Sequence, residues 1–247
     1  MSYVLVAALF LPLFPFSMLL NLILNRLRWP VARFMLLLAW PQIGVAILIL
    51  TDPIIHAFVV PWALATSALY ALRLLTVRDL NLWAALLATS VLPLTWGLAQ
   101  GGAPTENLYL FAFWFSLPPA LLVLLTQPLT ERFGAAYAGL PGGLSIMLPR
   151  LSAVLVVTLL AAVATPPFPG FFAMLDLLQR MSASAAIVTL VIWLVWGWGA
   201  TRLLQGFVVG AAKPTSINDI SRYSTWGYTS MLCALVVAGL YLTGGGL

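Results

Sequence analysis

Few side chains in this sequence could move an ion or a proton, and two of them lie four residues apart. Its 247 residues include 11 Lys and Arg, 6 Asp and Glu and a single His. Asp176 and Arg180 share a helix face at this spacing, so they could neutralise each other or belong to a proton relay in a membrane. The one histidine, His56, follows Asp52 and Pro53, where interfacial capping and titration are both open. These three residues are the candidate ion or coupling residues.

Other kinds of site lack the residues that they need. One histidine and one cysteine, Cys233, cannot supply the paired ligands of a zinc site or a two-histidine haem site. The glycines of Gly139-Leu-Pro-Gly-Gly-Leu144 are not followed by the lysine of a phosphate loop. We therefore expect no metal, no cofactor and no catalytic site in this chain, which could still be a subunit of a translocating oxidoreductase complex.

Composition assigns the chain to the integral membrane proteins. It is 63% hydrophobic and 7% charged, with a mean hydropathy of +1.07, values that a soluble domain does not reach. The hydropathy predicts an all-α protein, and a bilayer requires about 20 apolar residues for each span. Eight spans are predicted at 3–25, 33–50, 55–77, 82–99, 107–126, 150–165, 184–210 and 224–243. A shorter helix at 167–182 would be the ninth.

A proline-rich break interrupts this series at residues 165–182. Pro166, Pro167 and Pro169 remove three backbone donors and end the preceding helix, and Gly170 permits close backbone approach where the chain becomes helical again. Broken helices in membranes often line binding sites, so this segment is the candidate location for Asp176 and Arg180.

The remaining charges and small residues are explained by topology and packing. Arg26, Arg28 and Arg33 crowd the first loop, which places the N-terminus outside by the positive-inside rule. The side of the C-terminus stays open. Arg180, Arg202 and Arg222 would fall on both sides of the membrane whether or not the short helix is counted as a span. Loop arginines predict contact with anionic lipid and no nucleic-acid binding. Gly206 and Gly210 have the spacing of a helix-packing pair.

Four short motifs in order resemble a known family. They are Arg78-Asp-Leu-Asn-Leu-Trp-Ala-Ala-Leu-Leu-Ala-Thr-Ser90, Phe113-Trp-Phe-Ser-Leu-Pro-Pro-Ala-Leu-Leu-Val-Leu-Leu125, Leu148-Pro-Arg-Leu151 and Ala164-Thr-Pro-Pro-Phe-Pro-Gly-Phe-Phe-Ala-Met174. They resemble the antiporter-like membrane subunits of respiratory complex I, multisubunit cation/proton antiporters, membrane-bound hydrogenases and inorganic-carbon uptake complexes. The resemblance implies one transmembrane domain over 1–247, with N-terminal helices at 1–72, an antiporter-like region at 73–210, and a loop and last helix at 211–247.

The chain departs from the family pattern where that pattern carries charge. By the resemblance, the family's loop lysine corresponds to Asn81, its buried central lysine to Pro119, and its terminal lysine or glutamate to Met174. Asp176 lies two residues past the last position, which rotates its side chain by about 200° on a helix. The chain is also about half the family's usual length. These differences predict a shortened and degenerate subunit.

Two functions remain open at this point. The first is a non-pumping or weakly active antiporter-like subunit, a structural or coupling component of a larger energy-coupled complex for proton or cation translocation or inorganic-carbon uptake. Its partners would be other membrane subunits, lipid and a soluble peripheral subunit, in the bacterial inner membrane. The alternative is an autonomous small transporter or channel for a neutral or apolar substrate, bound at the 165–182 break.

Overall fold

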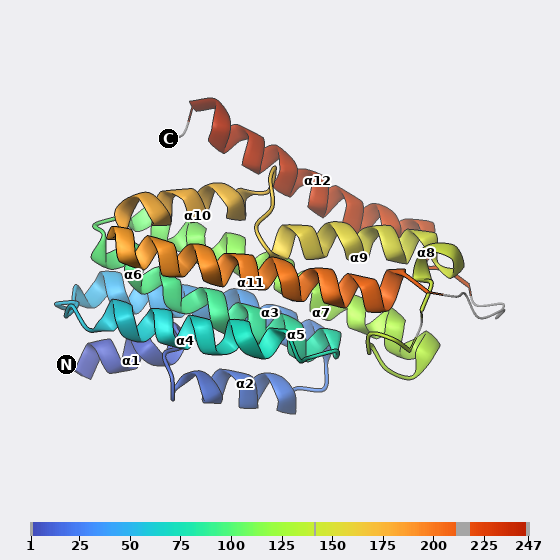
Figure 1. Ribbon diagram of the computed structural model, residues 1–247, viewed down its shortest axis with the longest axis horizontal. Helices are drawn as coiled ribbons and strands as arrows, with labels where there is room; N and C mark the ends of the chain where they lie inside the picture. Colours follow the sequence, from blue (N-terminus) through green and yellow to red (C-terminus); the bar gives the residue numbers. More distant parts are fainter. Residues whose placement is uncertain (1, 141, 211–217, 246–247) are drawn as a thin grey trace.

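Hydrophobic runs of membrane-spanning length form helices that lie nearly side by side (Figure 1). The computed structural model describes residues 2–140, 142–210 and 218–245. Its helices are α1 (Ser2–Phe10), α2 (Ser17–Arg26), α3 (Pro30–Thr51), α4 (Val59–Leu74), α5 (Leu80–Val91), the 3-10 turn η1 (Leu92–Leu94), α6 (Thr95–Gln100), α7 (Thr105–Phe133), α8 (Leu144–Met147), α9 (Pro149–Ala162), α10 (Pro169–Arg180), α11 (Ala183–Val208) and α12 (Arg222–Gly245). The described residues form no β-strand beyond one isolated bridge between Asp79 and Tyr137. The expectation of an all-α, multi-pass membrane protein is confirmed.

Local sequence explains where several helices begin and end. Asp79 precedes α5, and its Oδ1 accepts the backbone N–H of Leu82 at 2.8 Å, which caps the helix. Pro30 and Pro149 occupy the first positions of α3 and α9, where a missing N–H costs no helical bond. The observed bounds match most of the predicted spans to within a few residues, because the length of each apolar run sets them.

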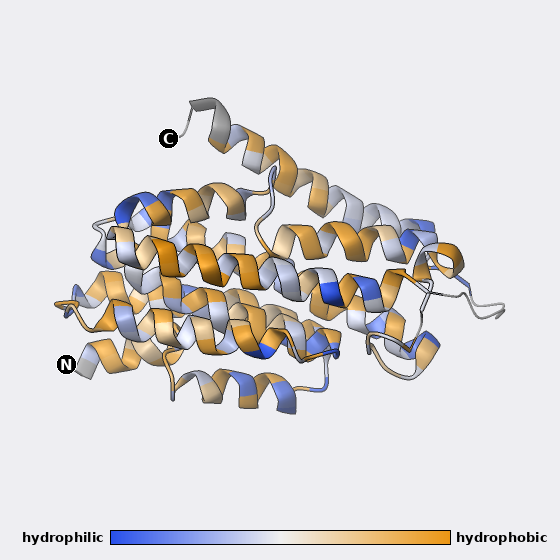
Figure 2. Ribbon diagram, in the orientation of Figure 1, coloured by the Kyte–Doolittle hydropathy of each residue, from blue (hydrophilic) through white to orange (hydrophobic). Residues whose placement is uncertain are grey.

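The segment Leu80–Gln100 lies at the centre of the bundle. This run of α5, η1 and α6 is 89% buried, whereas Arg222–Leu242 of α12 is 17% buried. Trp83 and Trp96 are fully enclosed. The middle of the helices is mostly hydrophobic, and hydrophilic residues gather toward the two ends of the long axis (Figure 2). The peripheral helices therefore present apolar faces of the kind that lipid or other membrane subunits cover.

The predicted continuous span at 3–25 is wrong in one respect. The chain leaves the helix between Phe10 and Ser17, where Pro12 and Pro15 occur, and α1 and α2 follow each other along the long axis. A proline run interrupts the backbone hydrogen bonds without lowering the hydropathy, so the hydrophobic pattern conceals the break.

The helices α9 and α10 form a second interrupted pair. They lie end to end along the long axis (Figure 1), and both contact α7 and α12. They therefore occupy one track through the bundle rather than two. The helices predicted at 150–165 and 167–182 are thus both present, and they share one track.

The end-to-end pairs sort the arginines of the described residues by end, whereas the acidic residues are divided: Asp79, Glu131 and Asp219 lie beside arginines. Every arginine of the described ranges except Arg180 belongs to one end, called here the cationic end. Its arginines are Arg26, Arg28, Arg33, Arg73, Arg78, Arg132, Arg150, Arg202 and Arg222. Two bonds connect distant parts of this end: Arg202 Nη1 donates to the Leu75 carbonyl at 2.7 Å, and Arg132 Nε donates to the Asn218 carbonyl at 2.9 Å. Asp52, Glu106 and Asp176 lie at the opposite, acidic end, where α1 begins and α12 ends.

Candidate functional site

The break between α9 and α10 is a tight turn that is buried at Ala164 and Phe168 and exposed at Pro166. Ala164 is fully buried and adopts a left-handed conformation, with a φ of 57°. Its backbone N–H donates to the Ala161 carbonyl at 3.1 Å, and the Phe168 N–H donates to the Thr165 carbonyl at the same distance. A Cβ on Gly170 would lie 3.3 Å from the Ala164 Cβ, so the small residue lets α10 begin against the turn. The turn is thus held by its own short-range bonds.

Neighbouring helices satisfy or cover the carbonyls that the break exposes. The Trp193 indole of α11 donates to the Val163 carbonyl at 2.9 Å. Thr165 Oγ1 donates to the Leu160 carbonyl at 3.0 Å. On the α12 side, a Cβ placed on Gly239 would lie 1.9 Å from the Pro167 carbonyl oxygen, so the helix backbone itself covers this group. Because unpaired backbone groups are costly in a bilayer, these contacts stabilise the break as a closed structure.

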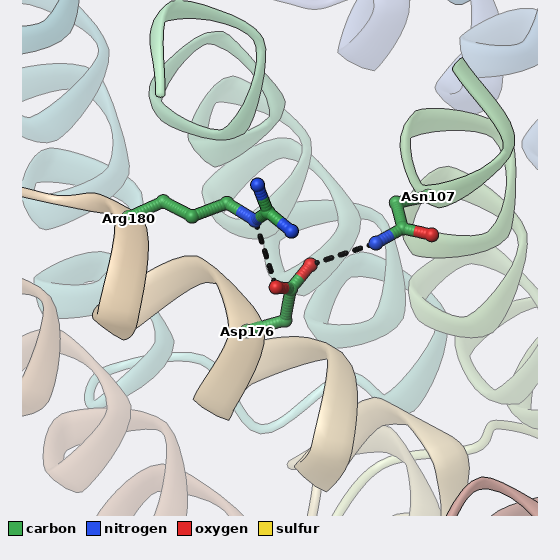
Figure 3. A network of polar contacts seen from close by, with 3 residues as sticks. All are labelled: Asn107, Asp176 and Arg180. Atoms are coloured by element: carbon green, nitrogen blue, oxygen red, sulfur yellow. Dashed lines mark hydrogen bonds and ion pairs between the residues drawn. The ribbon is translucent and has the colours of Figure 1, made fainter. Parts of the chain in front are cut away.

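The predicted pair of charges in α10 forms, and it has a third member. Arg180 Nε donates to Asp176 Oδ1 at 2.7 Å. Asn107, from the first turn of α7, donates through Nδ2 to Asp176 Oδ2 at 3.1 Å. Figure 3 shows the carboxylate between the guanidinium and the amide. Both carboxylate oxygens are therefore engaged, and the Asp176 side chain is 16% exposed.

A small cavity adjoins this network. It measures about 60 Å³ and is lined by Asn107, Trp114, Phe172 and Asp176 among others, which is room for no more than a few water molecules. It lies at the acidic end of the molecule, away from the middle of the bundle. Among the described residues, no group of three or more His, Cys, Asp or Glu side chains comes together to hold a metal.

The interior also contains two neutral polar clusters that the sequence did not predict. In the first, Ser17 Oγ and the Tyr70 hydroxyl lie 2.9 Å apart, Asn21 Nδ2 donates to the Ser17 carbonyl at 3.0 Å, and Thr89 donates to Asn21 Oδ1 at 3.2 Å. These bonds join α2, α4 and α5 without any charged side chain.

The second cluster lies beside the first. Ser90 Oγ donates to the Ser67 carbonyl at 2.7 Å and accepts the Trp196 indole N–H at 2.8 Å. Ser67, Ser90 and Trp196 are all buried. A sequence signal for both clusters existed in the adjacent hydroxyls of Thr66 and Ser67 and of Thr89 and Ser90, within otherwise apolar spans.

Comparison with known proteins identifies the architecture. No protein-family model and no curated protein matches the chain. A chain of respiratory complex I from Thermus thermophilus with bound NADH matches at a TM-score of 0.82 and 18% identity, over 98% of this chain and 54% of that one. A chain of the Mrp complex from Dietzia matches at a TM-score of 0.74 and 18% identity, over 86% of this chain and 42% of that one. A chain of the membrane-bound sulfane sulfur reductase, an archaeal respiratory membrane complex, matches at a TM-score of 0.78 and 15% identity, over 96% of this chain and 51% of that one.

This chain has the antiporter-like fold. The resemblance that four short motifs indicated is confirmed at the level of fold. The chain spans about half the length of the solved chains that it matches.

The three positions that the resemblance aligns with charged residues of the family hold neutral side chains here. Met174 of α10 and Pro119 of α7 are buried, and Asn81 is partly buried in the first turn of α5. Pro118 and Pro119 lack an N–H, so two carbonyls of α7 lose their helical donors although the helix continues. Asp176 contacts α7 through Asn107.

His56 is not part of the Asp176 network. It is exposed in the connection between α3 and α4, and its ring stacks on Phe58 with centroids 5.8 Å apart. Its backbone carbonyl accepts the Val59 N–H at 3.0 Å, so the main chain, and not the imidazole, bonds the first turn of α4.

The spacing of Gly206 and Gly210 predicted that a second helix packs against them, but a loop lies there instead. A Cβ on Gly206 would lie 2.8 Å from Ala138, in the segment after α7, and the Gly206 carbonyl accepts the Gly139 N–H at 2.8 Å. Gly210 lies beyond the end of α11, with a φ of 133°, next to Gly142. The small residues allow a loop, rather than a helix, to approach closely.

Proposed function

We propose that this chain is a non-pumping antiporter-like membrane subunit and a structural or coupling component of a larger energy-coupled complex. One observation carries the proposal: in the described residues, the polar side chains between the two ends of the bundle are hydroxyls, amides, indoles and one thiol, and the Asp, Glu, Arg and His side chains lie toward the ends. The antiporter-like fold supplies the class of complex, whose work would be proton or cation translocation or inorganic-carbon uptake.

The physical argument concerns what a proton path requires. A path through a bilayer uses carboxylates, lysines or histidines in the spans, since these groups accept and release charge and are expensive to keep there. Ser67 and Ser90 have no such capacity at ordinary pH. Asp176 is the remaining candidate, and Arg180 and Asn107 engage both of its oxygens. A carboxylate whose two oxygens both accept hydrogen bonds from protein groups is suited to holding α10 against α7.

The closed break supports a structural role for the segment that transporters use for binding. The Val163 carbonyl is bonded by Trp193, and the Pro167 carbonyl lies against Gly239. A substrate at this position would have to displace α11 or α12. The break therefore serves the packing of three helices, and the hydrogen bond from Asn107 to Asp176 fixes the far half of the track to α7.

The proposal includes an orientation and partners. By the positive-inside rule the cationic end faces the cytoplasm, and the start of α1 and the end of α12 face outward. Other membrane subunits would cover the apolar outer faces of α11 and α12, and a soluble peripheral subunit would dock to the complex. We place the complex in the bacterial inner membrane.

Mass spectrometry of what co-purifies with the tagged chain from native membranes in a mild detergent tests this proposal. We expect stoichiometric recovery of longer antiporter-like subunits or of a soluble catalytic partner, and their loss from a parallel sample in a denaturing detergent. Recovery of the chain alone, or only with itself, would contradict the proposal and favour the autonomous transporter or channel for a neutral or apolar substrate.

A further inference from the structure

A pocket at the cationic end combines arginines with an apolar wall. We name it the α2–α4 pocket. It has a volume of about 420 Å³ and is bordered by Asn21, Asn25 and Arg26 of α2, Tyr70 and Arg73 of α4, and apolar residues that include Met18 and Leu22. No acidic side chain lines it. The antiporter-like function proposed above makes no use of this pocket.

The two arginines lack protein partners that would explain their convergence. Arg26 and Arg73 occupy the last turns of α2 and α4, and both are exposed. Within the described ranges, neither guanidinium forms a hydrogen bond or an ion pair with a protein group, and the same holds for the Asn25 amide. Helix C-termini attract each cation separately. They do not compensate the mutual repulsion of two guanidinium groups on one cavity, so an anion is the missing component.

The wall of the pocket indicates which anion fits. Met18 and Leu22 are 56% and 47% exposed on the outer face of α2, where a membrane helix meets acyl chains. The polar groups of Asn21 and Tyr70 form the inner border and are already bonded to Ser17, which makes that border rigid. A ligand with a phosphate at the arginines and a hydrocarbon tail beside α2 satisfies both parts.

We propose that the α2–α4 pocket binds the phosphate of an anionic membrane lipid from the leaflet at the cationic end. The planar forks of Arg26 and Arg73 bind phosphate oxygens in pairs, and the Asn25 amide donates a further bond. The acyl chains lie along Met18 and Leu22. The positive-inside orientation places this pocket in the cytoplasmic leaflet, where anionic lipids are available to it.

The test is native mass spectrometry of the delipidated, purified chain titrated with phosphatidylglycerol. We expect saturable binding that weakens about fivefold for each arginine removed, and about thirtyfold in the Arg26→Gln, Arg73→Gln double variant. The matched control is Arg28→Gln, Arg78→Gln, which removes the same charge from the same end outside the pocket and changes affinity less than about threefold. The Arg26→Lys, Arg73→Lys variant keeps the charge but loses the paired bonds of the guanidinium forks, so we expect its affinity to lie between those of the unaltered chain and the glutamine double variant.

Three further arms distinguish the sources of the anion and the mode of binding. Equal weakening in both double variants would show general surface attraction and overturn the pocket, as would unchanged affinity in Arg26→Gln, Arg73→Gln. Displacement of the lipid by millimolar inorganic phosphate would assign the site to a soluble anion instead. Binding of phosphatidylcholine as tight as that of phosphatidylglycerol would show that the apolar wall acts alone and would also overturn the proposal.

Discussion

Replacement of Gly239 by alanine tests whether α12 seals the break. The added Cβ would lie 1.9 Å from the Pro167 carbonyl oxygen and 3.0 Å from the carbonyl carbon. The carbonyl belongs to the backbone of a tight turn and cannot rotate away as a side chain would. Helix α12 must therefore retreat by roughly 1 Å, the shortfall from an ordinary carbon–oxygen contact, and overpacking of this kind costs about 1–3 kcal/mol.

The control for this variant is Gly227→Ala in the same helix. Gly227 is exposed, and a Cβ there meets nothing within 4 Å. The substitution should stabilise α12 by about 0.5–1 kcal/mol, because alanine loses less backbone entropy than glycine in a helix. Gly239→Ala gains the same entropy term, so the two variants differ by the overpacking alone, roughly 1–3 kcal/mol, or about 2–12 °C in melting temperature for a chain of this size.

The assay is thermal unfolding of both variants and the unaltered chain in the same mild detergent. We expect Gly239→Ala to melt below the unaltered chain and Gly227→Ala to melt at or above it. If Gly239→Ala melted as high as Gly227→Ala, α12 would not rest on the Pro167 carbonyl, and the account of the closed break would be refuted.

Two related predictions concern buried hydrogen bonds. Trp193→Phe leaves the Val163 carbonyl without its donor in the span, so we expect a loss of about 1–3 kcal/mol in the free energy of unfolding, measured in detergent, with no comparable loss in Trp198→Phe, whose indole is 63% exposed. Ser90→Ala removes the acceptor of the Trp196 indole and should cost a similar amount, whereas the exposed Ser230→Ala control should change the melting temperature little; equal effects of the two serine variants would refute a structural role for the second polar cluster.

Much of the fold could be predicted because apolar length determines membrane helices. The predicted span at 33–50 corresponds to α3, and that at 184–210 to α11, with small differences at the ends. The break after α9 was also predictable, since three prolines in four residues cannot continue a helix. The break after Phe10 was missed because its flanking leucines keep the hydropathy high.

The site was predictable only where the contact is local. Asp176 and Arg180 are four residues apart, so their ion pair follows from helix geometry. Asn107 completes the network from 69 residues away, and no pattern in one sequence indicates that contact. The same limit applies to Gly239 against Pro167 and to Trp196 against Ser90. The side of the C-terminus required the end-to-end arrangement of α9 and α10, which hydropathy does not reveal.

The most direct test of the central claim is proton flux through the purified chain in liposomes, with a pH-sensitive dye inside and an imposed pH gradient. We predict a rate equal to that of protein-free liposomes, for the unaltered chain and for Asp176→Asn alike, because between the two ends of the described bundle there is no carboxylate, lysine or histidine to relay a proton. A rate well above the protein-free background that Asp176→Asn abolishes would contradict the account and make Asp176 part of a conducting path.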